Sequence, residues 1–132
     1  MFTISRETQF CYGHRLLHHP GRCRRLHGHN GRVRILLSAP LNTQGMVLDF
    51  GEIRETFERW IDENLDHHTL LEEGDPLVEA LRQAGEEVVV MASSPTAENI
   101  AHMLFEKAQN LGLPVVEVSI WETPKCRATY RE

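Results

Sequence analysis

The chain has 132 residues, of which 41% are hydrophobic, and a formal net charge of −5, so the size prior predicts one domain spanning residues 1–132. The acidic balance and a pI near 5.9 argue against a general nucleic-acid binder or a membrane-surface binder. Residues 1–20 are too polar for a signal peptide, no apolar run approaches the roughly 20 residues of a spanning helix, and three widely spaced cysteines do not suggest a disulfide framework, so we expect a cytoplasmic protein.

Two strands joined by a long loop are expected at the start of the chain. Apolar and polar residues alternate over residues 2–10 and again over residues 31–39, which predicts two half-buried strands. Residues 15–28 between them contain proline and glycines and predict a loop of a length that is usually functional. We expect the two strands to pair as an antiparallel hairpin.

Three histidines stand at the facing ends of these strands. His14 follows the first strand, and His27 and His29 precede the second, two residues apart, so that their rings share one side of an extended segment. Three neutral imidazoles can bind zinc and leave its fourth position open, as in catalytic zinc sites. Cys23 lies four residues before His27, close enough to reach the metal region. The alternative is three polar histidines on a loop.

The middle of the chain predicts two long helices. Apolar residues recur at helical spacing over residues 50–64, with Asp49 as the cap and Glu52 as its capping-box partner. A second long helix begins after Ser94, a plausible N-cap, and ends near Gly112. Residues 76–84 favour a short helix, and residues 88–91 form an apolar run that can be a strand.

Two further strands are expected over residues 114–123 and 126–131. The resulting order ββααββ predicts an α+β fold, with a four-stranded antiparallel sheet and two helices on one face.

Several polar residues allow two interpretations. Asp66 and His67 form either an ordinary helix terminus or an acid–base relay in which the carboxylate orients the imidazole. Cys23 is either an inert thiol or, beside zinc and arginines, a thiolate base. Glu122 is either solvated or a bidentate acceptor for a guanidine-like edge. The early arginines, Arg24 and Arg25 among them, form a solvated loop or bind an anionic small molecule.

Six collinear motifs give the chain a resemblance to the 6-pyruvoyl-tetrahydropterin synthase superfamily. The Cys-x-x-x-His-Gly-His spacing resembles most closely its bacterial branch, the 6-carboxy-tetrahydropterin synthases of queuosine biosynthesis. In order, the motifs are Phe10…His14-Arg15-Leu16, Cys23…Leu26-His27-Gly28-His29-Asn30, Gly45-Met46-Val47-Leu48-Asp49-Phe50, Leu65-Asp66-His67, Pro95-Thr96-Ala97-Glu98-Asn99 and Glu122-Thr123 before Tyr130.

The resemblance implies a tunnelling fold (T-fold) that assembles through sheet edges into a homohexamer, a dimer of trimers, with active sites between subunits. It implies a role for each matching residue. His14, His27 and His29 match the zinc ligands, Cys23 the catalytic base, Asp66 and His67 its proton relay, and Glu122 the pterin anchor. Thr96 is expected to line the pterin pocket, and Arg24 and Arg25 to help receive a triphosphate.

The implied reaction converts 7,8-dihydroneopterin triphosphate into 6-carboxy-5,6,7,8-tetrahydropterin, acetaldehyde and triphosphate. Three alternatives stay open: a 6-pyruvoyl-tetrahydropterin synthase, a zinc-dependent pterin-binding protein without turnover, and a purely structural zinc domain. The chain departs from the family pattern at Tyr12, where small residues are usual, at Gly31, where an aromatic residue is common, and at Leu71, where asparagine is frequent.

Overall fold

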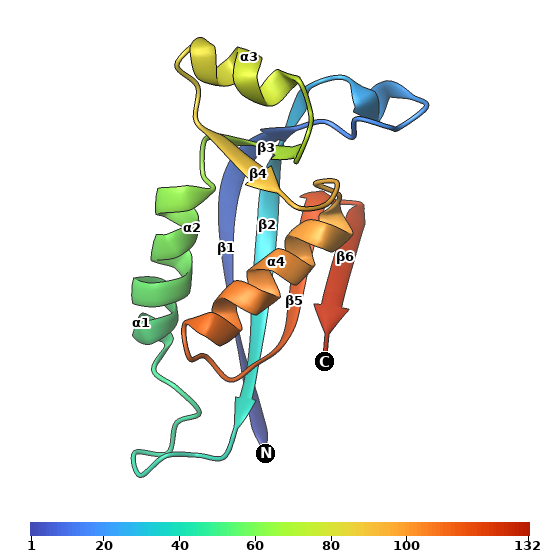
Figure 1. Cartoon of the computed structure of the whole chain (residues 1–132). Helices are drawn as coiled ribbons and strands as arrows, with labels where there is room; N and C mark the ends of the chain where they lie inside the picture. The colour runs from blue at the N-terminus through green and yellow to red at the C-terminus, as the bar shows by residue number, and fades with distance from the viewer.

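A mixed sheet of six strands runs through the molecule, in the order β4-β3-β1-β2-β5-β6 (Figure 1). The computed structural model describes residues 1–132. The strands are β1 (Phe2–His14), β2 (His27–Ala39), β3 (His68–Glu72), β4 (Val88–Met91), β5 (Val115–Thr123) and β6 (Cys126–Arg131). The pairs β1–β2, β2–β5 and β5–β6 are antiparallel, which confirms the expected four-stranded antiparallel unit.

Two short strands extend that unit, so the sheet has six strands rather than four. β3 pairs in parallel with β1, and β4 pairs in parallel with β3. β4 forms where the apolar run over residues 88–91 allowed a strand, whereas no sequence pattern predicts β3. Leu70 and Leu71 are adjacent and both buried, so β3 has no alternating pattern to mark it.

The β1–β2 ladder is longer than predicted, with unbroken pairing from Phe2↔Ala39 to His14↔His27. β1 therefore includes residues 11–14, and β2 begins at His27 rather than at residue 31. The expected loop shrinks to residues 15–26, with a short 3₁₀ turn at Arg22–Arg24. As a result, His27 and His29 lie in a regular strand.

The helices confirm the predicted positions with one correction. α1 (Phe50–Ile53), a π-helical turn (Arg54–Glu58) and α2 (Arg59–Asn64) form one continuous helix, and the Asp49 side chain caps it. α3 spans Leu77–Gln83 and α4 spans Ala97–Asn110. The predicted cap of α4, Ser94, is wrong. The Thr96 hydroxyl caps instead, accepting the Asn99 N–H at 3.1 Å, because the Ser94 carbonyl is held in the preceding turn by Thr96 N.

The hydrophobic core lies between the sheet and the helices that cover one of its faces (Figure 1). Alternate residues of β1 and β2 point into it, beginning with Phe10, Tyr12, Val33 and Ile35, each at most 3% exposed. The same alternation carries His14 to the end of the core face, where it is also buried. No helix is both long and apolar enough to span a membrane.

Candidate metal centre and acid–base site

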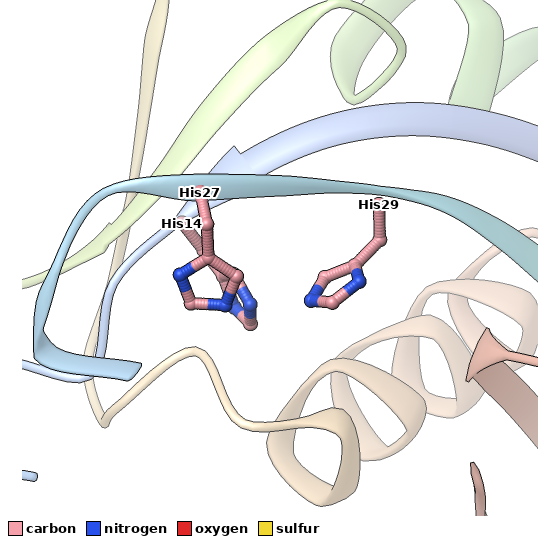
Figure 2. Close-up of side chains that lie close together, drawn as sticks. All are labelled: His14, His27 and His29. Atoms are coloured by element: carbon pink, nitrogen blue, oxygen red, sulfur yellow. The ribbon is translucent and has the colours of Figure 1, made fainter. Parts of the chain in front are cut away.

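Three imidazoles converge where β1 and β2 end and begin. His14 and His27 are direct partners in the ladder, and His29 lies two residues further along β2 on the same side. Ring centroids are 4.5 Å apart for His14 and His27, 5.0 Å for His14 and His29, and 5.1 Å for His27 and His29. The rings point toward the segment that leads into α4 (Figure 2). This confirms that the three histidines meet at one end of the hairpin.

Two backbone carbonyls fix the ring tautomers. The Nδ1–H of His14 donates to the Pro95 carbonyl at 2.8 Å, and that of His27 donates to the Arg25 carbonyl at 2.6 Å. Each ring is thereby left with an Nε2 lone pair. Such outer carbonyls orient metal-binding histidines in known sites. Burial, as the largest cause, lowers the pKa of His14 to about 4, so this ring is neutral near pH 7.

The cluster fits a zinc ion. One ligand atom from each histidine lies within 4.8 Å of the others, and Nε2 of His14 and of His29 are buried without any hydrogen-bond partner. Leaving a buried polar nitrogen unpaired costs about 1–3 kcal/mol. A metal ion that accepts both lone pairs would remove that cost, and three imidazole ligands leave one position open for a substrate.

Glu122 and Tyr12 border the histidines. A Glu122 carboxylate oxygen lies 3.4 Å from Nε2 of His29, so the predicted pterin anchor stands directly beside the metal cluster. The Tyr12 ring meets His14 edge-on, with centroids 5.2 Å apart, and its hydroxyl is buried without a partner. Burial first, and then the charge of Glu122, raise the pKa of Tyr12 far above its usual range.

Asp66 and His67 meet each other and the thiol of Cys11, a residue with no role assigned from the sequence. Nδ1 of His67 is 2.8 Å from Oδ2 of Asp66 and 3.4 Å from Sγ of Cys11. The Cys11 N–H donates to Oδ1 of Asp66 at 2.9 Å, and the His67 N–H donates to the Cys11 carbonyl at 2.7 Å. These three residues and Asn30 border one end of the hairpin.

The alternation of residues along β1 could have shown from the sequence that Cys11 faces away from the core. Tyr12 and His14 face the core, so Cys11 faces the other side of the sheet. There it lines a cavity of about 520 Å³ together with Gly28, Asn30 and His67.

The predicted base, Cys23, contacts neither group. It is partly buried in the 3₁₀ turn, its carbonyl accepts the Leu16 N–H at 2.8 Å, and its sulfur belongs to neither cluster of close ligand atoms. The relay of Cys23 with Asp66 and His67 is therefore not assembled within one chain.

The early arginines divide into two sets. Arg15, Arg32 and Arg34 pair with carboxylates, whereas Arg22, Arg24 and Arg25 are exposed in the loop and have no ion-pair partner. Of these six, the second set is free for an anion. Thr96 uses its hydroxyl to cap α4, which holds the Pro95 carbonyl close to His14.

Comparison with known proteins gives consistent matches over the whole chain. Residues 3–132 match the family model described as 6-pyruvoyl tetrahydropterin synthase. The probable 6-carboxy-5,6,7,8-tetrahydropterin synthase of Halobacterium salinarum is 40% identical over 122 residues, which cover 88% of this chain and 77% of that one. The 6-carboxy-5,6,7,8-tetrahydropterin synthase of Rickettsia bellii is 35% identical, covering 96% and 97% of the two chains. Among solved structures, an uncharacterised protein from Wolinella succinogenes superposes with a TM-score of 0.80 at 32% identity, covering 99% and 98%.

Proposed function

Because the chain belongs to the 6-pyruvoyl tetrahydropterin synthase family and has its tunnelling fold, we propose that it is a zinc-dependent 6-carboxy-5,6,7,8-tetrahydropterin synthase. It would convert 7,8-dihydroneopterin triphosphate and one water molecule into 6-carboxytetrahydropterin, acetaldehyde and triphosphate. The observation that carries the proposal is the convergence of His14, His27 and His29 beside a carboxylate suited to a pterin. Nε2 of His14 and of His29 is buried and unpartnered.

The residues around the cluster suit the parts of this substrate. The Glu122 carboxylate can accept two hydrogen bonds from the amino-pyrimidine edge of a pterin, at a position 3.4 Å from His29. The exposed Arg24 and Arg25 can receive the triphosphate, since neither is neutralised by a carboxylate. A zinc ion held by the three histidines would act as a Lewis acid toward the substrate side chain.

The protein groups would then move the protons. Cys23 would remove a proton from a side-chain carbon of the substrate, and His67 would supply one while Asp66 holds its ring. The short contact between His67 and Asp66 supports this second role.

We further propose that the enzyme works as a homo-oligomer, two stacked trimeric rings with sites between subunits. Two observations support this. Cys23 lies apart from Asp66 and His67 within one chain, so a neighbouring chain would have to complete the relay. The outer edges of β4 and β6 are also unpaired, and pairing between protomers would cover them. We expect the assembly in the cytoplasm, where the three free cysteines stay reduced.

A product assay tests the activity. The zinc-loaded protein is incubated with 7,8-dihydroneopterin triphosphate, products are identified by mass spectrometry, and metal content is measured on the same sample. Release of acetaldehyde with 6-carboxytetrahydropterin supports the proposal. Formation of 6-pyruvoyl-tetrahydropterin, or binding of the pterin without product at full zinc content, would replace it with one of the alternatives.

A pair of cysteine variants tests the base. Cys23→Ala should keep its zinc and lose turnover, whereas Cys126→Ala, at an exposed position in β6, should match the parent protein in both. Full turnover in Cys23→Ala would exclude Cys23 as the base.

A further inference from the structure

We propose that Cys11, Asp66 and His67 form a second site for a zinc-class divalent cation, with Sγ, Oδ2 and Nδ1 as ligands. A second part of the proposal rests on the proposed function: a cation in this site withdraws His67 and Asp66 from proton transfer, so excess zinc inhibits the enzyme.

The spacing of the three donor atoms fits a tetrahedral ion. All three lie within 4.8 Å of one another. With Zn–S and Zn–N bonds of about 2.3 and 2.0 Å, tetrahedral ligands place S and N about 3.5 Å apart, and the distance between Sγ of Cys11 and Nδ1 of His67 is 3.4 Å. The Asp66 oxygen, 2.8 Å from Nδ1, needs to withdraw by only about 0.5 Å to reach the tetrahedral spacing.

The hydrogen bonds of the group also favour an ion. Two acceptors, Sγ of Cys11 and Oδ2 of Asp66, approach the same ring nitrogen of His67. One proton on Nδ1 can make a well-aligned hydrogen bond to only one of them. A divalent cation bonds to Nδ1, to Oδ2 of Asp66 and to the Cys11 thiolate at once, while the thiol proton is released to solvent and the imidazole keeps its proton on Nε2. Sulfur, nitrogen and oxygen are all accepted zinc ligands.

The backbone holds the three ligands in place before any ion arrives. Cys11 lies within the β1–β2 ladder opposite Asn30. Two hydrogen bonds join it to the other members, from its N–H to the Asp66 carboxylate and from the His67 N–H to its carbonyl. His67 is the one non-glycine residue with positive φ, 62°, a left-handed conformation that costs about 1–2 kcal/mol. That conformation and these bonds set the ring beside Cys11.

The site is accessible and separate from the histidine cluster. Cys11 and His67 line the cavity of about 520 Å³ described above, which residues His27 and His29 also border, and the His67 side chain is 78% exposed, so an ion can reach the site from solvent. Cys11 and Tyr12 are consecutive strand residues and point to opposite faces of the sheet. Filling of one site therefore leaves the ligands of the other free.

Cobalt titration of the metal-free, full-length protein tests the site. The wild-type protein should bind two equivalents of Co²⁺, and the second should produce a thiolate-to-cobalt charge-transfer band in the near ultraviolet. Cys11→Ser should abolish that band and weaken the second equivalent by at least about tenfold. Asp66→Asn, which keeps an oxygen for the Cys11 N–H, should weaken it similarly. Cys126→Ser, at an exposed thiol outside both clusters, serves as the matched control and should retain both equivalents and the band.

Three results would overturn the proposal: binding of only one equivalent by the wild-type protein, a second equivalent that persists in Cys11→Ser, or loss of its band in Cys126→Ser instead. None of these readouts depends on turnover, so they stand if the proposed activity fails. In the active enzyme, the zinc concentration that halves turnover should rise at least about tenfold in Cys11→Ser. Equal inhibition of both proteins would refute the inhibitory role alone.

Discussion

Substitution of Gly31 by alanine should destabilise the protein by forcing the Tyr12 ring against the three clustered histidines. A Cβ at position 31 would lie 2.9 Å from Cε1 of Tyr12 and 3.6 Å from Cδ1 of Ile120. The ring has little room to retreat. It stacks on Phe10 at 5.0 Å between centroids and meets His14 at 5.2 Å.

The size of the effect follows from the chain length and the cost of overpacking. Extra methyl groups in a filled core cost about 1–3 kcal/mol. The unfolding entropy of 132 residues is about 0.28 kcal/mol/K, at about 2.1 cal/mol/K per residue. A loss of about 2 kcal/mol therefore lowers Tm by about 7 °C. Urea and thermal unfolding of the metal-free protein, at one fixed protein concentration, measure both quantities.

Gly13 supplies the matched control in the facing strand. A Cβ there meets nothing closer than 3.6 Å, so Gly13→Ala should stay within about 0.5 kcal/mol of the parent. Tyr12→Leu removes the ring, so Gly31→Ala should cost at least about 1 kcal/mol less in that background, as a double-mutant cycle would show. Strict additivity, or an unchanged Tm in Gly31→Ala, would refute the argument that the Tyr12 ring occupies this space.

Two further predictions concern Asp75 and Thr96, which stabilise segments next to the histidine cluster without belonging to it. Asp75 is 3% exposed, pairs with Arg15 and accepts the Leu77 N–H at 2.8 Å, so Asp75→Asn should cost about 2–3 kcal/mol in urea unfolding at pH 7. The Arg15 hydrogen bond is the largest of the causes that lower the pKa of Asp75, so its stabilisation is complete above the ordinary carboxyl pKa and is lost as pH falls through the lowered value. Wild-type stability should thus decline more steeply than that of Asp75→Asn below about pH 4, and parallel curves would contradict the pairing. Thr96→Ala should destabilise α4 by about 1 kcal/mol while Thr96→Ser stays near the parent, and equal stability of all three proteins would show that the cap contributes nothing.

The histidine cluster was predictable because it depends on local patterns and one pairing. Alternation in two strands and the antiparallel rule place His14 opposite His27, and strand periodicity places His29 on the same side. The long helices and the β5–β6 hairpin were predictable for the same reason, since each is encoded by a periodic run of residues.

The acid–base cluster was only half predictable because it depends on non-local structure. Asp66 and His67 stand out as neighbours in sequence, but their contact with Cys11 requires β3 to pair in parallel with β1. That pairing involves three residue pairs, Tyr12↔His68 to His14↔Leu70, and a left-handed residue just before it. Neither the short parallel pairing nor the left-handed residue produces a periodic pattern of apolar residues in the sequence. The capping role of Thr96 was missed because Ser94 and Thr96 are equally acceptable N-caps, and only the turn before α4 decides between them.

The β1–β2 ladder ends at the pair His14↔His27, and this affects how the loop between the two strands can change among relatives. Both ends of the segment 15–26 are held by the same cross-strand pair. Residues 16–26 can therefore vary while the three histidines keep their arrangement, provided that Arg15 still pairs with Asp75 and a carbonyl at position 25 still accepts the Nδ1–H of His27. That segment carries Cys23 together with Arg24 and Arg25. Chimeras that exchange residues 16–26 between relatives should therefore replace Cys23 and the two exposed arginines together and leave the three histidines in place.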